Sequence, residues 1–213
     1  MRETRTPNRR GEGALLRAEI VTAARRLLER SGNEDALTLR AVAREAGIAA
    51  PSIYGHFVDR AQILDAVVGE VFGELEHAVR AASDAEPDPA RRLHSVCRAY
   101  LDFAHRQPAG YRVLFGRSRG APEREEVSRE MSDLSGAGAF GVLAEAVAAA
   151  RAGNGPSSGT PAALSASPTV LTEATVLWVA LHGYATLRAN VPVFPWPDGL
   201  LTLLVDRLAG TPG

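Results

Sequence analysis

The segment Thr38–Phe57 holds the residue types that suit contact with a nucleic acid. One expected helix in this segment presents an outward face of small or polar side chains, which are Ala50, Ser52, Tyr54 and His56. A face without bulk can enter a groove of DNA, where side chains reach base edges and phosphates. The alternative is an ordinary corner between two helices inside a helical protein, in which the same face would be buried.

Two helices must hold that face, and the sequence predicts them at about 38–46 and 50–56. They would cross through a tight turn that needs a residue tolerant of positive φ, and Gly47 supplies it. A small residue, Ala43, lies four positions earlier, where the second helix packs closely. The apolar residues that would seal the corner are Val42, Ala46, Ile48 and Ile53. Because these requirements are met together, the segment is predicted to be a DNA-binding helix-turn-helix.

Residues 15–64 resemble the DNA-binding domain of the tetracycline-repressor (TetR) family. The resemblance is carried by the runs Leu37-Thr38-x-Arg40, Val42-Ala43-x-x-Ala46-Gly47-Ile48 and Pro51-Ser52-Ile53-Tyr54-x-His56-Phe57, followed by Arg60 and Leu64. Farther along, Pro108-x-x-Tyr111-x-x-Leu114-Phe115 is similar to a turn in many members. Trp178-x-x-x-His182-Gly183 resembles the Trp-His-Gly signature of one C-terminal subtype.

The resemblance implies a ligand-responsive repressor that binds a palindromic operator as a homodimer and is released by a small-molecule effector. The second helix of its helix-turn-helix would lie in the major groove of double-stranded DNA. Its larger C-terminal region would hold the effector site and dimerise through helices at about 168–190 and 198–209, with a further contribution from residues 139–151. The alternative is a helical interaction protein of the same fold with weak or lost operator binding.

The resemblance also implies which residues face DNA. They are Thr38, Arg40, Ala50, Pro51, Ser52, Tyr54, His56 and Arg60. Thr38 would cap its helix and meet a phosphate, and Arg40 would reach a guanine edge or a phosphate. Ala50 and Pro51 would pack against a thymine methyl, while Ser52 would bond a base or a phosphate. Tyr54 and His56 would contact phosphates at the exit of the second helix, and Arg60 would lie beside the DNA backbone.

Three positions depart from the family's pattern. Ala49 stands where many members carry a serine or threonine that caps the recognition helix, so that cap is missing or comes from another group. Position 50 is often long and polar and position 55 is often bulky, whereas this chain has Ala50 and Gly55. Sequence choice is therefore expected to depend on Arg40, Tyr54 and the shape of the DNA.

Aromatic residues after residue 60 are candidates for an effector site. Tyr100, Phe103, Phe115, Trp178 and Tyr184 would line an apolar cavity among the helices there, although each taken singly is more often a core residue. His182 is expected to pack or form a hydrogen bond within a helix interface.

The apolar positions recur with a 3.6-residue period, so the fold is predicted to be all-α. The helix-turn-helix domain is expected at 14–59, and the helical effector-binding and dimerisation domain at 60–213, with a flexible loop at 153–167. Residues 1–13 are expected to be a flexible basic arm whose arginines either track DNA or are solvated. Those arginines are Arg2, Arg5, Arg9 and Arg10.

Composition excludes several classes of protein. With 46% hydrophobic and 23% charged residues, the chain of 213 residues is globular. The single cysteine, Cys97, excludes a disulfide within the chain and a zinc site built of cysteines. Residues 1–60 hold eleven arginines against eight acidic residues, which favours a polyanionic partner for that part. No signal-like segment and no apolar run of about 20 residues is present, which predicts a cytoplasmic protein without a membrane partner.

Two patterns that could suggest catalysis or a metal have simpler explanations. Residues 116–120 match the Gly-x-Ser-x-Gly nucleophile elbow, but that elbow works only between a strand and a helix of an α/β sheet. His94 and Cys97 lie one helical turn apart, yet no second pair completes a metal site. We therefore expect no enzyme activity, no cofactor and no metal.

Overall fold

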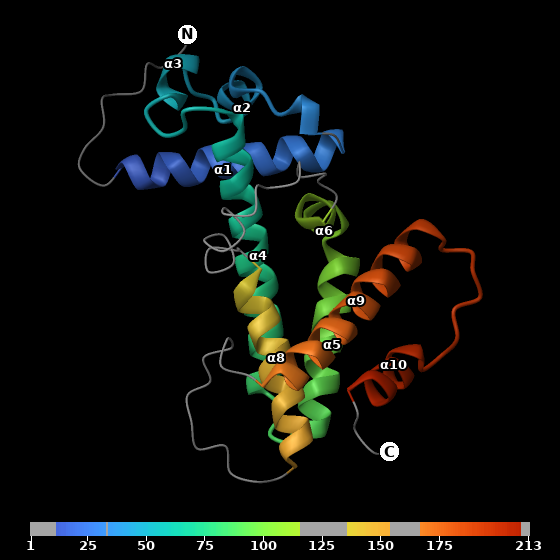
Figure 1. Cartoon of the computed structure of the whole chain (residues 1–213). Coiled ribbons are helices and arrows are strands. Elements are labelled where there is room, and N and C mark those ends of the chain that lie inside the picture. The colour runs from blue at the N-terminus through green and yellow to red at the C-terminus, as the bar shows by residue number, and fades with distance from the viewer. Residues whose placement is uncertain (1–11, 33, 116–135, 154–166, 210–213) are drawn as a thin grey trace. The chain divides into compact units, whose positions relative to one another are not determined.

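A computed structural model describes residues 12–32, 34–115, 136–153 and 167–209 (Figure 1). Every regular element in these ranges is a helix, which confirms the predicted all-α fold. Residues 1–11 of the expected arm, the elbow-like residues 116–120 and most of the expected loop at 153–167 lie outside the described residues. The last two residues of the expected arm, Glu12 and Gly13, instead belong to the first helix.

Contacts between Cα atoms divide the chain into unit 1, Met1–Glu70, and unit 2, Val71–Gly213. The sequence suggested a division at the start of the helix that begins near residue 60. The contact grouping instead divides the chain inside that helix, α4 (Arg60–Asp84). The first turns of α4 bury Ile63, Leu64 and Val67, and these residues group with unit 1.

Unit 1 contains short helices around one apolar core. Its elements are α1 (Glu12–Ser31), the 3-10 helix η1 (Glu34–Ala36), α2 (Leu39–Glu45), α3 (Ala50–Ile53) and the first turns of α4. Helix α1 packs against α2, and α2 packs against α3. The largest fully buried side chains of this unit include Ile20, Leu37, Val42, Ile53 and Phe57. Burial of these residues is what holds η1, α2 and α3 in place, since helices of three, seven and four residues are marginal alone.

Polar side chains tie α1 to its neighbours. The Arg30 guanidinium donates to both carboxylate oxygens of Glu45 on α2, at 2.8 and 2.6 Å. These hydrogen bonds lower the pKa of the Glu45 carboxyl. The Arg17 guanidinium lies 4.8 Å from the centroid of the Phe57 ring, a cation–π contact between α1 and the segment before α4.

Unit 2 is built around α5. Its elements after α4 are α5 (Pro89–Arg106), α6 (Pro108–Phe115), α8 (Ala137–Ala152), α9 (Pro168–Asn190) and α10 (Leu200–Leu208). Helix α5 contacts α6, α8, α9 and α10, and α9 also contacts α8 and α10. The core includes Leu93, Val96, Val142, Leu177 and Leu181. The segment 139–151, which the sequence analysis assigned to the dimer, lies within α8, which begins two residues earlier, at Ala137.

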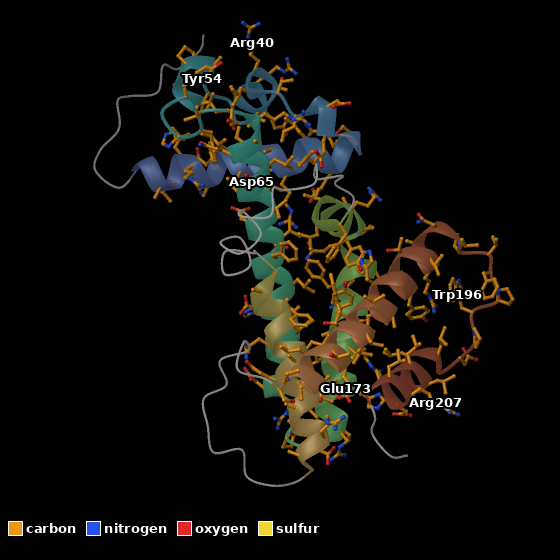
Figure 2. The ribbon with its side chains drawn as sticks, viewed as in Figure 1. Arg40, Tyr54, Asp65, Glu173, Trp196 and Arg207 are labelled. Atoms are coloured by element: carbon orange, nitrogen blue, oxygen red, sulfur yellow. The ribbon has the colours of Figure 1, made fainter. Side chains whose placement is uncertain are left out.

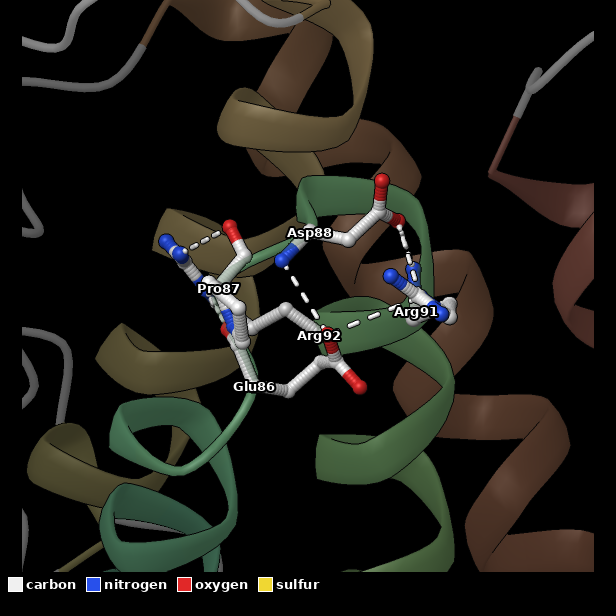
Figure 3. A network of polar contacts seen from close by, with 5 residues as sticks. All are labelled: Glu86, Pro87, Asp88, Arg91 and Arg92. Atoms are coloured by element: carbon white, nitrogen blue, oxygen red, sulfur yellow. Dashed lines mark hydrogen bonds and ion pairs between the residues drawn. The ribbon is translucent and has the colours of Figure 1, made fainter.

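Hydrogen bonds fix the turn between α4 and α5. Asp88 caps α5 by accepting a hydrogen bond from the backbone N–H of Arg91 at 2.8 Å, and Pro89 follows at the first position of the helix. Arg92 donates to the backbone carbonyls of Glu86 and Pro87, each at 2.8 Å (Figure 3). The start of α9 has the same kind of cap, because Ser167 accepts from the N–H of Val170.

The cap of α4 differs in one bond from a standard capping box. Asp59 accepts from the N–H of Gln62 at 2.9 Å, as in that motif. The Gln62 side chain reaches back to the N–H of Val58, at 3.0 Å, rather than to that of Asp59. The entry to α4 is thus fixed one residue earlier than the standard motif predicts.

Among the described helices, α9 alone has the length and apolar composition that a membrane span would need. One such helix is weak evidence for a span, because core helices of other proteins pass the same test. Four of its apolar residues, Val170, Ala174, Leu177 and Leu181, are buried within unit 2.

Candidate nucleic-acid interface

The turn between α2 and α3 has the geometry that the glycine predicted. Gly47 has a φ of +68°, a left-handed conformation that side chains with a Cβ rarely adopt. The N–H of Ile48 donates to the carbonyl of Ala43 at 2.9 Å, which closes the end of α2. Of the four residues expected to seal the corner, Val42 and Ile53 are buried, whereas Ala46 and Ile48 are half-buried. Ala43, the small residue expected under the second helix, is buried.

The two helices of this corner are capped differently. Thr38 is the N-cap of α2, and its hydroxyl oxygen accepts from the N–H of Ala41 at 3.1 Å. Ala49 is the N-cap of α3, and no side chain of the described residues forms a cap hydrogen bond there. Extended backbone at Ala49, with φ −70° and ψ 138°, is nevertheless the conformation that a capping residue adopts.

Helix α3 is shorter than the predicted span of 50–56. It ends at Ile53, whose carbonyl accepts from the N–H groups of both His56 and Phe57, at 3.0 and 2.9 Å. Tyr54 is the C-cap, so Gly55 lies in the turn after the helix. Gly55 therefore does not weaken a helix interior, because it lies in the turn after the helix.

Most of the predicted DNA-facing residues are exposed on one end of unit 1. Thr38, Arg40, Pro51, Ser52 and Tyr54 are exposed, and Ala50, His56 and Arg60 are half-buried. Tyr54 keeps 58% of its surface accessible. The side chains of Arg40 and Tyr54 project from the end of unit 1 that α2 and α3 form (Figure 2). Within the part of the chain that the structure describes, Arg40 forms no ion pair or hydrogen bond through its side chain.

Two arginines, Arg60 and Arg44, change the predicted set of DNA-facing residues. Arg60 lies 3.7 Å from the Glu34 carboxylate, and its Nε is buried without a hydrogen-bond partner among the described residues. Its guanidinium is thus partly engaged within unit 1. Arg44 is exposed one helical turn after Arg40 on α2, and sequence reasoning missed it. The i, i+4 spacing of the two arginines on a single helix is the signal that would have found it.

Unit 2 contains a cluster of aromatic side chains around His182, and we call it the His182 cluster. The Phe115 ring lies 4.7 Å from the His182 ring and 4.8 Å from the Tyr111 ring, centroid to centroid. The further members, in ring contact with these or with each other, are Phe72, Tyr100, Phe140 and Trp178. Its residues come from α4, α5, α6, α8 and α9.

Three of the five predicted effector residues, Tyr100, Phe115 and Trp178, belong to the His182 cluster. Phe103 is buried on α5. Tyr184 lies elsewhere, with its ring 5.5 Å from that of Trp196 and its hydroxyl 2.6 Å from Nη1 of Arg188. Sequence reasoning missed Phe72, Tyr111 and Phe140 as members, because partners on separate helices cannot be read from spacing along the chain.

A chain of hydrogen bonds runs through the His182 cluster. The Tyr111 hydroxyl lies 2.7 Å from Nδ1 of His182 and 2.9 Å from the Tyr100 hydroxyl. Burial lowers the pKa of His182, so the imidazole is neutral near pH 7. Burial raises the pKa of Tyr100 to about 12 and that of Tyr111 as well, so both phenols keep their protons. The Tyr111 hydroxyl has one proton for these two contacts, so it donates either to Nδ1 of His182 or to the Tyr100 oxygen, and the tautomer of His182 decides which.

Comparison with known families agrees with this geometry. The profile of the bacterial regulatory proteins of the tetR family matches residues 20–67, and that of a tetracyclin repressor-like C-terminal domain matches residues 93–208. The second match alone spans more than half of the chain. The chain belongs to the TetR family. It is a DNA-binding helix-turn-helix regulator with an all-α fold, whose matched regions lie in unit 1 and unit 2 respectively.

Several known proteins are similar to this chain. A protein of unknown function from Rhodococcus sp. RHA1 has 26% identity and a TM-score of 0.69, with 92% of this chain and 94% of that chain covered. The fatty acid degradation regulator FadR from Bacillus halodurans has 13% identity and a TM-score of 0.64, covering 98% and 97%. The nucleoid occlusion factor SlmA of Vibrio cholerae is 27% identical over 100 residues, 47% of this chain. The chain spans about half the length of the SlmA proteins that it matches.

Proposed function

We propose that this TetR-family regulator is a homodimeric repressor that binds a palindromic operator and releases it when a small-molecule effector binds unit 2. The observation that carries the proposal is the division of α3 into two faces. Pro51 and Ser52 are exposed, whereas Ile53 is fully buried. A helix with this division can lie in the major groove while its inner side stays packed in unit 1.

Base and phosphate contacts follow from the exposed groups. Arg40 reads a guanine edge or a phosphate with its guanidinium fork, and Arg44 adds a phosphate contact one turn later. The Thr38 hydroxyl accepts the cap bond through its oxygen, so its proton is available to a phosphate. Ala50 and Pro51 meet thymine methyl groups, and Ser52 meets a base or a phosphate.

The last turn of the motif supplies positioning contacts. Tyr54 and His56 contact phosphates where the chain leaves α3. Arg60 contributes less than the sequence suggested, since it is already paired with Glu34. With so few side chains able to read bases, the shape of the operator supplies part of the specificity.

Dimerisation through α9 and α10, with help from α8, is supported by exposed apolar residues. Those on the segment from α9 to α10 are Val176, Val179, Leu187, Val191, Val193, Phe194 and Leu203. Clustered apolar exposure of this kind marks a surface that another protein covers. A twofold dimer presents two copies of unit 1, which is why the operator is a palindrome.

The His182 cluster is the proposed effector site. Its rings offer stacking surfaces, and the His182 imidazole and the two tyrosine hydroxyls offer polar groups for a ligand. Helix α4 is the one described helix with residues in both units, so an effector in unit 2 acts on unit 1 through α4. The effector can do so only if it binds one arrangement of α4 better than the other. Trp178, His182 and Gly183 also support assignment to the Trp-His-Gly subtype.

The same proposal places the protein in the cytoplasm, where its DNA is, without an enzyme activity. A helical interaction protein that has lost operator binding is the second candidate, and the missing cap and small side chains of α3 favour it.

Selection of bound duplexes from a random DNA library separates the two candidates. A repressor enriches a palindrome, and its affinity falls steeply with salt, by a logarithmic slope of about −0.9 for each phosphate contacted. An interaction protein enriches no sequence. Small molecules are then screened for release of the selected duplex, and an effector of the proposed site also changes the fluorescence of Trp178 in a Trp196→Phe variant.

A further inference from the structure

The hydrogen-bond chain from Tyr100 through Tyr111 to His182 can run in two directions. In the first direction, the Tyr100 hydroxyl donates to the Tyr111 oxygen, Tyr111 donates to Nδ1 of His182, and the imidazole proton is on Nε2. In the second direction every bond is reversed, and the imidazole proton is on Nδ1. The two directions differ in which group is left without a partner at the end of the chain.

Burial favours the first direction. Tyr100 is 6% exposed, and in the second direction its hydroxyl proton has no acceptor among the described residues. An unpaired donor at so buried a position is costly. In the first direction the unpaired donor is Nε2–H of His182, and this imidazole is half-buried, so water can reach it. The favoured tautomer of His182 therefore has its proton on Nε2.

The indole of Trp178 supports the same direction. Burial raises the pKa of Tyr100 to about 12, and hydrogen bonds with Tyr111 and Trp178 partly offset that rise. An indole N–H only donates, so the Tyr100 oxygen accepts from Trp178. A hydroxyl that accepts one hydrogen bond donates the next more strongly, which favours donation from Tyr100 to Tyr111. The chain then ends in a donor, Nε2–H, while both phenol oxygens already accept hydrogen bonds.

Ring surfaces lie beside this imidazole. The Phe115 ring lies 4.7 Å from the His182 ring, and the Trp178 ring lies 6.4 Å from it, centroid to centroid. Phe72 contacts the first of these rings and Phe140 the second, and all four aromatic side chains are half-buried rather than fully enclosed. Aromatic rings pair through their faces and edges. A ligand that contains an aromatic ring therefore matches the accessible parts of the cluster.

The His182 cluster has no formal charge to offer a ligand. Burial lowers the pKa of His182, so its imidazole is neutral at pH 7.5. The two charged residues of the neighbouring helix α8 are already paired, Glu145 with Arg80 and Arg151 with Glu173. A carboxylate ligand would lose hydration without meeting a cation in the cluster. An ammonium ligand has only donors, and these would face the Nε2–H.

We infer that the His182 cluster takes an uncharged aromatic carbonyl compound, whose carbonyl oxygen accepts from Nε2–H of His182 while its ring packs against Phe115 and Trp178. The inference rests on the proposed effector site and adds the chemical class of its ligand. A carbonyl oxygen is an acceptor without a proton of its own, so it matches a site whose unpaired group is a donor.

Four molecules with the same bicyclic skeleton test the class at pH 7.5. 1-Tetralone has the carbonyl, tetralin has no polar atom, 1-aminotetralin is a cation, and tetralin-1-carboxylic acid is an anion. Binding to the full chain, labelled with ¹⁵N-tryptophan, is measured by the shift of the Trp178 indole signal. The signal of Trp196, the other tryptophan, reports unit 2 outside the cluster, and its loss in Trp196→Phe assigns the two signals.

We expect 1-tetralone to bind at least about tenfold more tightly than tetralin, because tetralin leaves the Nε2–H without an acceptor. The amine and the acid should also bind more weakly than 1-tetralone. Tightest binding by tetralin, the amine or the acid overturns the inference and leaves the effector site in place. If none of the four shifts the Trp178 signal, the inference and the proposed site fail together. Binding in the expected order without release of the operator contradicts the proposed repressor response and leaves the ligand class standing.

A change of the donor separates direct contact from a structural role. His182→Phe keeps a ring but removes Nε2–H, so the preference for 1-tetralone over tetralin should fall below about twofold while the Kd of tetralin stays the same. A purely structural role would raise both Kd values together and contradict the inference. Tyr184→Phe removes a hydroxyl of α9 outside the cluster and should keep the full preference.

The tautomer of His182 is measured without altering the cluster. In ¹⁵N-histidine spectra, the signal of His182 is the one that remains when each of the other histidines is substituted in turn. The inference expects a proton on Nε2 and none on Nδ1. A proton on Nδ1 overturns it, because Nε2 would then be an acceptor and the site would select a donor.

Discussion

The exposed surfaces of unit 1 and unit 2 differ in the side chains that they present. The end of unit 1 formed by α2 and α3 shows two guanidinium groups, hydroxyls and small residues. Helix α9 in unit 2 instead exposes Val176, Val179 and Leu187. A surface that binds and leaves DNA must tolerate water between encounters, whereas a surface that stays covered need not. In the proposed function, the end of unit 1 therefore binds and releases DNA, while the second copy of the chain covers the exposed apolar residues of α9.

The two units are expected to unfold independently of each other. Phe57→Ala should destabilise unit 1 by about 3–5 kcal/mol, because the ring is 1% exposed and its loss leaves a cavity. A unit of this size has little stability to lose, so DNA binding should disappear. Both tryptophans, Trp178 and Trp196, lie in unit 2, so their fluorescence in urea reports unit 2 alone, while far-ultraviolet circular dichroism reports both units.

Leu177→Ala is the matched change in unit 2, where the side chain is fully buried. It should lower the urea midpoint seen by tryptophan fluorescence, while Phe57→Ala should leave that midpoint in place. If Phe57→Ala shifts the fluorescence midpoint as much as Leu177→Ala does, the two units unfold as one and the comparison fails.

The DNA face should depend on Arg40 without affecting the dimer. Arg40→Ala is expected to weaken binding to the selected operator by about 1–3 kcal/mol and to relax the choice of one base in each half-site. Fluorescence anisotropy with labelled duplexes measures the change, and Arg112→Ala removes an equal charge from an exposed site of unit 2 as a control. Unchanged affinity for Arg40→Ala would remove this residue from the readout.

Adding the missing cap of α3 should raise the stability of unit 1. Ala49→Ser should stabilise unit 1 by about 1 kcal/mol, since the backbone at position 49 is already extended and a serine oxygen can accept from the start of α3. Ala49→Val offers no such oxygen and serves as the control. Urea denaturation followed by circular dichroism measures both, and no gain for serine would show that the start of α3 needs no cap.

The smallest effect concerns pH and unit 2. Because burial lowers the pKa of His182 below 6.5, the unfolded chain binds a proton there more readily than the folded chain does. That difference vanishes well above pH 6.5, where both states are neutral, and it destabilises unit 2 as the pH falls below about 6.5. The effect is modest because the imidazole is half-exposed. The urea midpoint of Trp fluorescence should fall less between pH 7.5 and 5.5 in His182→Gln than in wild type, and an equal fall would contradict this account.

Local geometry was predictable from the sequence because single residues determine it. The positive φ of Gly47 and the caps at Thr38, Asp88 and Ser167 follow from residue types and from bonds that close within a few positions. The early end of α3 did not follow, because it depends on the Ile53 carbonyl accepting two bonds from the turn that leads to Phe57. The apolar periodicity of the chain did not indicate that α3 ends at Ile53.

In unit 2, contacts between helices that are far apart in the sequence could not be predicted. Tyr111 meets His182 across 71 positions, and no pattern along the chain pairs them. Tyr184 and Trp178 are both aromatic residues of α9, yet they belong to different clusters. The pairing of Arg60 with Glu34 likewise depends on how η1 lies against α4. Residue type indicated which side chains could act, and only the packing of the helices decided which of them meet.

The most direct test of the contrast between the units is the stoichiometry and affinity of the complex with DNA. Sedimentation equilibrium is run with the selected duplex and with a duplex in which one half-site is scrambled. The account predicts that two copies of the chain bind the intact palindrome. It also predicts an affinity at least about 100-fold weaker for the scrambled duplex, because a dimer held together by unit 2 binds both half-sites at once. A single copy that binds both duplexes equally well would contradict it.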